Sequence, residues 1–204
     1  MELKFTANQT RKITTLGILG ALGAILMTYI QVPYPPLAFL KIEFSDVVVL
    51  IAFLLFGWKE AAFLGVLKAV INALVWGLVG PYGIGQIAAF MASMTYVAGM
   101  YLAIKLTIQN KQWLTMILVV GLVTVVMVIA NFFFVTPLYI GLSLSEAISF
   151  ITPESFGFNV GGGYIMAILI AYVPFNLIKG VLIMVIFFIV KKALFTYLEF
   201  NQES

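Results

Sequence analysis

The sequence contains no cysteine and no histidine. Without cysteine there are no disulfide bonds and no thiolate nucleophiles, and without both residue types the usual zinc sites and the common forms of haem ligation are excluded. We therefore expect the chain to hold no metal ion and no resident cofactor.

Charged residues are also scarce. They make up 9% of the 204 residues, whereas a soluble domain normally carries about 25%. Hydrophobic residues make up 63% and the mean hydropathy is +1.14, so most of the surface must face lipid. The 17 glycines favour close helix packing, and no segment shows the sustained alternation of a membrane β-barrel. We predict an all-α integral membrane protein, a bundle of six transmembrane helices forming a single membrane domain over residues 1–204.

Helix-breaking residues divide the chain into these spans. The proline-rich run after Ile30 cannot continue a helix, and Gly80-Pro81 breaks the chain again. The predicted spans are residues 13–30, 46–56, 61–79, 84–106, 114–140 and 163–190. Residues 141–162 are expected to form a polar loop.

The basic residues test this division, because they accumulate on the cytoplasmic side of membrane proteins. With six spans and both termini in the cytoplasm, only Lys41 lies in an outer loop. The inner face then carries Lys4, Arg11, Lys12, Lys59, Lys105, Lys111, Lys191 and Lys192. An odd number of spans would remove this asymmetry. The net charge of +3 follows from the same rule and implies no nucleic-acid partner.

Five polar residues interrupt the apolar spans. Lys68 and Asn72 are four residues apart and Asn176 and Lys179 three apart, so each pair shares a helix face, and Asn131 stands alone in the fifth span. Ionisable groups at bilayer depth are rare and usually mark a binding site or a substrate path. The alternative is that Asn131 only bonds a neighbouring helix and that the lysines extend to the membrane surface. Considered as a set, they favour a binding site.

The segment of residues 33–46 combines prolines with apolar side chains, including Phe39 and Leu40. An outer loop of this composition could fold back as a lid, with Lys41 or Glu43 reaching polar atoms of a ligand. A rigid spacer is the equally acceptable alternative.

The first span carries two pairs of small residues at a spacing of four, Gly17 with Ala21 and Gly20 with Ala24. Such pairs allow close approach of a second helix. The spacing does not distinguish a helix of the same bundle from a helix of a partner protein.

Other absences argue against a self-sufficient pump. No GxxxxGK[ST] run is present to cradle ATP phosphates. The carboxylates, among them Glu43 and Asp46, fall near span ends or in loops, so we expect none at mid-membrane for proton coupling. The two halves also show no inverted repeat.

Several segments resemble the riboflavin-specific substrate-binding (S) subunit of energy-coupling factor transporters, and the resemblance spans essentially the whole chain. The segments that carry it are Phe39-Leu40-Lys41-Ile42-Glu43-Phe44-Ser45-Asp46, the lysine and asparagine of the third span, Gly80-Pro81, Asn131, and Pro174-Phe175-Asn176-Leu177-Ile178-Lys179-Gly180. Where the wider superfamily has Ala-xxx-Ala on the first helix, this chain has its glycine–alanine pairs.

The resemblance implies a subunit of the cell membrane that is not an enzyme. It would capture riboflavin outside and then dock with a shared transmembrane subunit and two ATP-binding subunits. The implied ligand contacts are Asn131, Asn176, Lys179, Leu40, Phe39, Lys41, Glu43, Lys68 and Asn72, and the implied docking residues are Gly17, Gly20, Ala21 and Ala24. Asparagine can both donate to and accept from the pyrimidine edge of a flavin, and lysine can donate to its oxygens.

The sequence is also compatible with two other functions, and it does not show whether flavin mononucleotide is bound as well as riboflavin. An S subunit for another vitamin (thiamine, folate, pantothenate or biotin) would share the bundle and differ in its pocket. An intramembrane enzyme would need a lysine such as Lys68 or Lys179 in contact with a serine such as Ser93, and no sequence motif indicates one.

Overall fold

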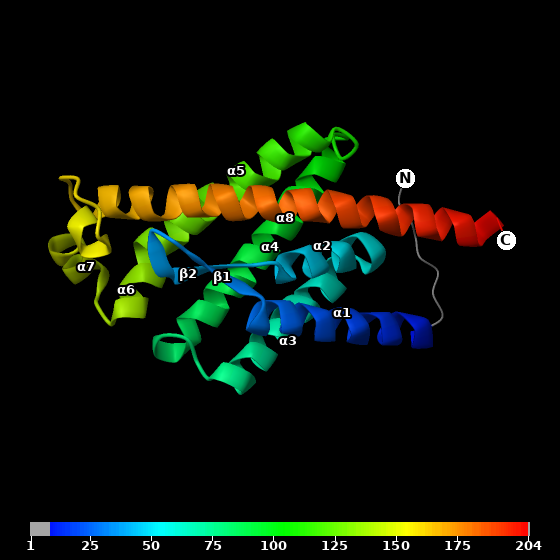
Figure 1. Ribbon diagram of the computed structural model, residues 1–204, viewed down its shortest axis with the longest axis horizontal. Helices are drawn as coiled ribbons and strands as arrows, with labels where there is room; N and C mark the ends of the chain where they lie inside the picture. The colour runs from blue at the N-terminus through cyan, green and yellow to red at the C-terminus, as the bar shows by residue number, and fades with distance from the viewer. Residues whose placement is uncertain (1–8, 204) are drawn as a thin grey trace.

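The computed structural model describes residues 9–203, and its dominant elements are long helices. Figure 1 shows α8 running along the length of the molecule, with α1 and α3 on the opposite side of the bundle. Helix α5 packs between α4 and α8, and α1 packs against α3 and α2. The main helices are α1 (Gln9–Tyr29), α2 (Ser45–Phe56), α3 (Trp58–Trp76), α4 (Ile84–Lys105), α5 (Gln112–Ala130) and α8 (Tyr164–Glu203).

These helices begin and end close to the predicted spans. Among the described residues, four are long and apolar enough to cross a membrane, namely those at Gln9–Tyr29, Pro81–Lys105, Gln112–Ile140 and Tyr164–Leu194. Helix α2 is apolar but has 12 residues, and α3 carries Lys59, Glu60 and Lys68 within its 19 residues. The structure therefore supports a mostly helical protein with four candidate membrane spans, and the count of six stays a prediction.

The expectation of an all-helical chain is corrected by a β-hairpin after α1. Strands β1 (Gln31–Tyr34) and β2 (Leu37–Glu43) pair antiparallel, with Gln31 opposite Glu43. Pro33 has no N–H to donate, and the register shifts beside it, which an edge strand tolerates. Tyr34, Leu37 and Ile42 are buried against α8 and its neighbours. The segment predicted as a loop is thus an ordered hairpin folded onto the bundle.

The predicted span 114–140 is continuous but changes its helical geometry at Asn131. Helix α5 passes into a π-helical turn, η2 (Asn131–Val135), and then into α6 (Thr136–Ile140). Pro137 accounts for this change, because it has no N–H and its ring crowds the carbonyl one turn earlier. Turns of this kind occur often at functional sites.

Residues 141–162 are not the plain polar loop that we predicted. They contain α7 (Leu144–Phe150) and a short 3₁₀ turn, η3 (Pro153–Phe156). The Ser143 hydroxyl and the Glu146 carboxylate cap the start of α7 reciprocally. Figure 1 shows this element at the end of the molecule opposite the C-terminus.

Helix α8 continues through Pro174 without a break. Tyr164, Ile168 and Tyr172 of its first half form one apolar cluster with the buried side chains of the hairpin. Its second half packs through Ile183 and Phe187 on the larger core shared by α2, α4 and α5. Asn176 and Lys179 lie between these two apolar clusters, and this position brings them to the site described below.

Candidate functional site

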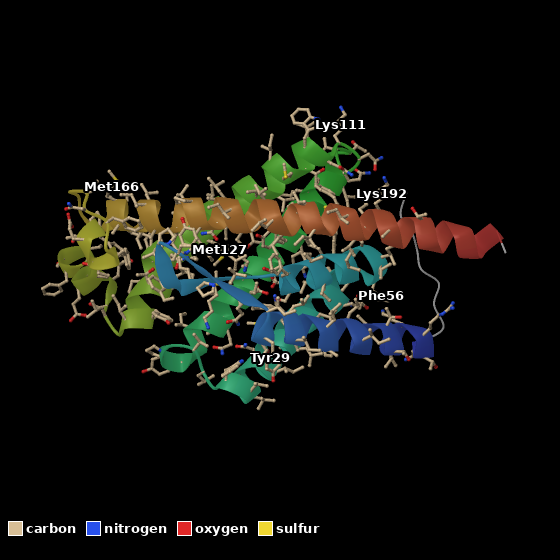
Figure 2. The ribbon with its side chains drawn as sticks, in the orientation of Figure 1. Tyr29, Phe56, Lys111, Met127, Met166 and Lys192 are labelled. Carbon is tan, nitrogen blue, oxygen red and sulfur yellow. The ribbon has the colours of Figure 1, made fainter. Side chains whose placement is uncertain are left out.

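A cavity of about 450 Å³ lies between the hairpin and the helices α3, α4, α5 and α8. Pockets that bind small molecules usually measure about 300–1,000 Å³ and are mostly apolar with a few convergent polar groups. The apolar lining includes Met27, Leu40, Ala88, Ala92, Val123, Met127, Val135 and Phe175. Figure 2 labels Met127 near the middle of the molecule. The cavity therefore has the size and composition of a small-molecule site.

Asn131, Asn176 and Lys179 all line this cavity and are buried. Asn131 Nδ2 donates to the Met127 carbonyl at 2.7 Å, and Asn176 Nδ2 donates to the Tyr172 carbonyl at 2.8 Å. Each bond fixes its amide and uses one of its two N–H groups. Asn131 Oδ1 also accepts from Thr136 Oγ1 at 3.4 Å. The second N–H of each amide and the side-chain carbonyl of Asn176 remain available for a ligand.

Asn72 lines the same cavity but is also part of a packed hydrogen-bond group. Gln86 Nε2 donates to Asn72 Oδ1 at 3.1 Å and to the Gly77 carbonyl at 3.0 Å. The Val79 N–H donates to Gln86 Oε1 at 3.0 Å. This group closes the end of α3 onto α4, so Asn72 helps to build the cavity wall.

The hairpin forms another wall through four predicted residues, all from β2. Phe39, Leu40, Lys41 and Glu43 line the cavity. The Phe39 ring lies 6.2 Å from that of Tyr139 and 6.0 Å from that of Phe156. These ring contacts connect the hairpin to α6 and to η3.

Lys68 is not among the residues that line the cavity. Its Nζ donates to Asp46 Oδ1 at 2.7 Å and to Ser45 Oγ at 2.5 Å, and the side chain is 1% exposed. Lys68 and Asn72 share a helix face, as the spacing predicts, but they contact different groups. We therefore leave Lys68 out of the ligand contacts.

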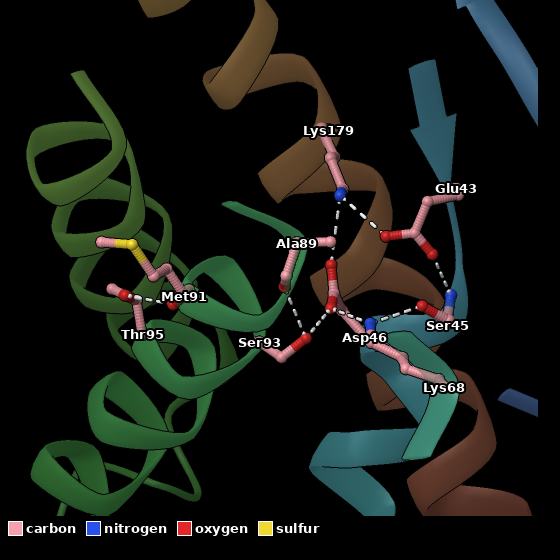
Figure 3. Close-up of polar contacts among 9 residues, drawn as sticks. All are labelled: Glu43, Ser45, Asp46, Lys68, Ala89, Met91, Ser93, Thr95 and Lys179. Atoms are coloured by element: carbon pink, nitrogen blue, oxygen red, sulfur yellow. Dashed lines mark hydrogen bonds and ion pairs between the residues drawn. The ribbon is translucent and has the colours of Figure 1, made fainter. Parts of the chain in front are cut away.

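Glu43 and Asp46 lie at the end of β2 and in the first turn of α2, near a span end as expected, but they are not exposed loop residues. Glu43 and Asp46 are buried between the two lysines that interrupt the spans (Figure 3). Lys179 Nζ lies 2.9 Å from Glu43 Oε1 and 3.2 Å from Asp46 Oδ2. The hairpin explains this arrangement, because it carries the chain into the bundle before α2 begins. With Lys68 included, the cluster contains two positive and two negative groups.

Glu43 is held by two elements at once. Its Oε1 accepts from Lys179, and its Oε2 accepts from the Ser45 N–H at the start of α2 at 2.8 Å. Burial opposes ionisation of this side chain, but the ammonium groups of Lys179 and Lys68 outweigh it and lower the pKa of Glu43. The ionised carboxylate joins β2 to both α2 and α8.

The small residues of α1 divide between two environments. Gly20 and Ala24 are buried against the bundle, and a methyl group added at Gly20 would approach Leu67 Cδ2 to 2.7 Å. Gly17 and Ala21 are exposed, and nothing lies within 4 Å of a methyl group added at Gly17. Gly20 and Ala24 therefore serve packing within this chain, and we leave them out of the predicted docking set.

The enzyme alternative required a lysine in contact with a serine. Ser93 instead donates to Asp46 Oδ1 at 2.6 Å. Lys68 does contact Ser45, but Asp46 holds the same ammonium group as an ion pair. Lys68 and Ser45 are buried outside the cavity lining, where a substrate would not meet them.

Sequence reasoning missed two hydroxyl groups at the cavity, those of Tyr96 and Thr28. Both are buried and have no hydrogen-bond partner within the described part of the chain. Buried polar atoms are rarely left unpaired, so each is a candidate to meet a ligand atom. No spacing in the sequence sets these residues apart, since tyrosine and threonine are ordinary in membrane helices.

Comparisons with known proteins place the chain in a family. The family model described as the ECF transporter substrate-specific component matches residues 11–191. The riboflavin transporter FmnP of Bacillus subtilis (strain 168) is 26% identical over 198 residues, covering 96% of this chain and 98% of that protein. The riboflavin transporter RibU of Streptococcus thermophilus (strain ATCC BAA-250 / LMG 18311) is 31% identical over 186 residues, covering 90% and 82%.

A solved structure has the same fold. It is described as the structure and mechanism of the S component of a bacterial ECF transporter, and it superposes with a TM-score of 0.70 at 24% identity. The match covers 94% of this chain and 99% of that one. Since the family model spans nearly the whole sequence, the chain belongs to the substrate-specific components of energy-coupling factor transporters, a family of transport proteins and not of enzymes.

Proposed function

We propose that this chain is the riboflavin-binding subunit of an ATP-driven energy-coupling factor importer in the cell membrane. Among the observations that support this, one carries the proposal. A single cavity joins Asn131 from η2 with Asn176 and Lys179 from α8, and the hairpin forms its wall. The names of the full-length relatives supply the ligand, because both are riboflavin transporters.

The chemistry of the cavity suits riboflavin. The vitamin is uncharged, with an apolar tricyclic ring, a pyrimidine edge of alternating donors and acceptors, and a chain of hydroxyl groups. The apolar lining, including Leu40, Met127 and Phe175, would contact the ring. Asn131 and Asn176 would bond the pyrimidine edge, and Lys179 would donate to a ligand oxygen. Buried partners left unpaired would cost about 1–3 kcal/mol each, so this site would reject analogues that lack the edge.

The proposed topology is a single membrane domain with six spans and both termini in the cytoplasm. Figure 2 shows Lys111 and Lys192 in the half of the molecule toward which the C-terminal part of α8 extends, and Met166 near the opposite end. Lysines concentrated at one end are what the cytoplasmic excess of basic residues predicts. Lys4, which also supports this orientation, lies outside the described residues. The cavity wall formed by Lys41 and its strand would then face the outside.

Energy for transport would come from partner proteins. The sequence has no phosphate-binding loop of its own. In this proposal the loaded subunit docks with a shared transmembrane subunit and two ATP-binding subunits. The exposed pair Gly17 and Ala21 on α1 would contact the transmembrane subunit, because small residues allow close helix approach.

The proposal is tested by purifying the protein in detergent from cells supplied with riboflavin. We expect a yellow sample with visible flavin absorbance, and we expect the ligand-free protein to quench the fluorescence of added riboflavin at one site per chain. Thiamine, folate, pantothenate and biotin, added in excess, should not displace the flavin. A colourless protein that fails to quench riboflavin would contradict the proposal, and displacement by another vitamin would favour an S subunit of different specificity.

A further inference from the structure

Asp46 lies at the centre of the buried charge cluster and outside the cavity lining. It belongs to the first turn of α2 and is fully buried, at 0% exposure. Figure 3 shows side chains from three other helices directed at its carboxylate, Lys68 from α3, Ser93 from α4 and Lys179 from α8. A single side chain therefore connects four helices.

The two oxygens of Asp46 have different partners. Oδ1 accepts from Lys68 Nζ at 2.7 Å and from Ser93 Oγ at 2.6 Å. Oδ2 has no hydrogen-bond partner among the described residues and lies 3.2 Å from Lys179 Nζ. Lys68 and Ser93 thus fix the carboxylate from one side, and its other oxygen is left to attract Lys179.

Lys179 is the residue on which this arrangement acts. An ammonium group has three N–H donors. Lys179 donates one to Glu43 Oε1 and forms an ion pair with Asp46 Oδ2 without a hydrogen bond, so donors remain for the cavity that Lys179 lines. Glu43 belongs to the hairpin, whereas Asp46 belongs to a helix packed on all sides. Lysine is a long and flexible side chain, so a fixed acceptor is needed to hold its ammonium in one position.

Lys68 completes the cluster by balancing charge. With Glu43 and Asp46 ionised, Lys68 and Lys179 make the group neutral, and removing one member alone would leave a buried charge unpaired. We propose that Asp46 is a positioning residue for ligand binding, which fixes the ammonium of Lys179 at the cavity wall, and that Lys68 and Ser93 fix Asp46. This inference rests on the proposed function, because it assigns Lys179 a contact with the vitamin.

The test separates positioning from charge balance. The paired substitution Asp46→Asn with Lys68→Gln removes one charge of each sign and keeps the cluster neutral. We expect the purified variant to stay folded and to bind riboflavin about 10-fold or more weakly, because an interaction with a charged group is lost. The control Thr95→Ala removes a hydroxyl of the same helix as Ser93 that donates to the Met91 carbonyl and lies outside the charge cluster and the cavity lining, so its affinity should stay within about threefold of wild type.

A double-mutant cycle shows whether the effect passes through Lys179. In a Lys179→Gln background, the same pair of substitutions should change the affinity by less than about threefold, because the group that Asp46 positions is already gone. Wild-type affinity in the paired variant would overturn the inference, as would an equal loss in the Lys179→Gln background.

A second variant tests the same inference if the paired variant does not fold. Asp46→Glu keeps every charge and moves the carboxylate by one methylene, and we expect weaker riboflavin binding. Unchanged affinity there would overturn the inference. If the wild-type protein itself does not bind riboflavin, the proposed function fails, and this first titration identifies that outcome before any variant is compared.

Discussion

Lys179 Nζ lies 2.9 Å from Glu43 Oε1, although 136 positions of sequence separate the two residues. The pair connects the end of β2 to the middle of α8, where both residues line the cavity. Breaking such a buried pair by removing one partner is costly, about 3–5 kcal/mol in comparable cases. The hairpin is therefore fixed to the bundle at the site where we propose that the vitamin binds.

Loss of the Glu43 carboxylate should loosen the hairpin. In Glu43→Gln the Lys179 ammonium keeps only Asp46 as an ionised partner, and we expect faster hydrogen exchange in residues 31–43 than in the wild-type protein. Lys41→Gln, an exposed position on the same strand, is the matched control and should leave exchange unchanged. Equal exchange in Glu43→Gln and wild type would show that the ion pair does not hold the hairpin.

Riboflavin should protect the same hairpin. Phe39 and Leu40 line the cavity, and a bound ring would cover them, so exchange in residues 31–43 should slow when ligand is added. Identical exchange with and without riboflavin would leave the hairpin as a spacer and not a lid.

Replacing Asn176 with leucine should weaken riboflavin binding by roughly 1–3 kcal/mol, because the ligand edge would lose its partner. The bundle should stay folded, since leucine has a similar size and the lost bond to the Tyr172 carbonyl lies within one helix. Titration of the purified variant measures the change. A control at an exposed position of the same helix, Leu177→Ala, should bind as the wild-type protein does.

The Tyr96 hydroxyl offers a sharper test of the cavity, because it has no partner among the described residues. If it bonds the ligand, Tyr96→Phe should lower riboflavin affinity by about 0.5–1.5 kcal/mol. The thermal stability of the ligand-free protein should not fall, since no protein hydrogen bond is lost. Unchanged affinity would remove Tyr96 from the ligand contacts.

The two faces of α1 should respond differently to bulk. Ala21→Trp adds volume at an exposed position, so the protein should bind riboflavin normally but lose uptake and co-purification with the transmembrane partner. Gly20→Trp places the same side chain against Leu67 and should destabilise the bundle by overpacking. Full transport by Ala21→Trp would show that this face is not the docking surface.

The sequence predicts the helices of this fold well, and for a physical reason. Apolar runs ended by Pro33 or by Gly80-Pro81 leave little choice of where a helix can lie, and most observed bounds differ from the predicted ones by a few residues. The exception is the end of α8, which continues to Glu203 beyond the predicted end at residue 190. The convergence of Asn131, Asn176 and Lys179 on one cavity could also be predicted, because polar side chains within apolar spans are energetically costly and usually mark a binding site. The predicted role of these residues in riboflavin binding is for the titrations above to decide.

Features that depend on tertiary packing could not be predicted in the same way. Glu43 and Asp46 precede a span in the sequence and look like loop residues, and only the inward course of the hairpin buries them. The pairs on α1 have identical spacing, so the pattern cannot tell the exposed Ala21 from the buried Ala24. The spacing of Lys68 and Asn72 predicts a shared helix face, but it does not show that Lys68 bonds Asp46 while Asn72 bonds Gln86.

The most direct test of the account is an experimental structure of the protein bound to riboflavin. We predict that the flavin ring lies in the cavity beneath the hairpin, with its pyrimidine edge within hydrogen-bonding distance of Asn131 and Asn176 and one ligand oxygen within reach of Lys179 Nζ. A flavin bound elsewhere, or bound in this cavity without contact to these three side chains, would contradict the proposed site.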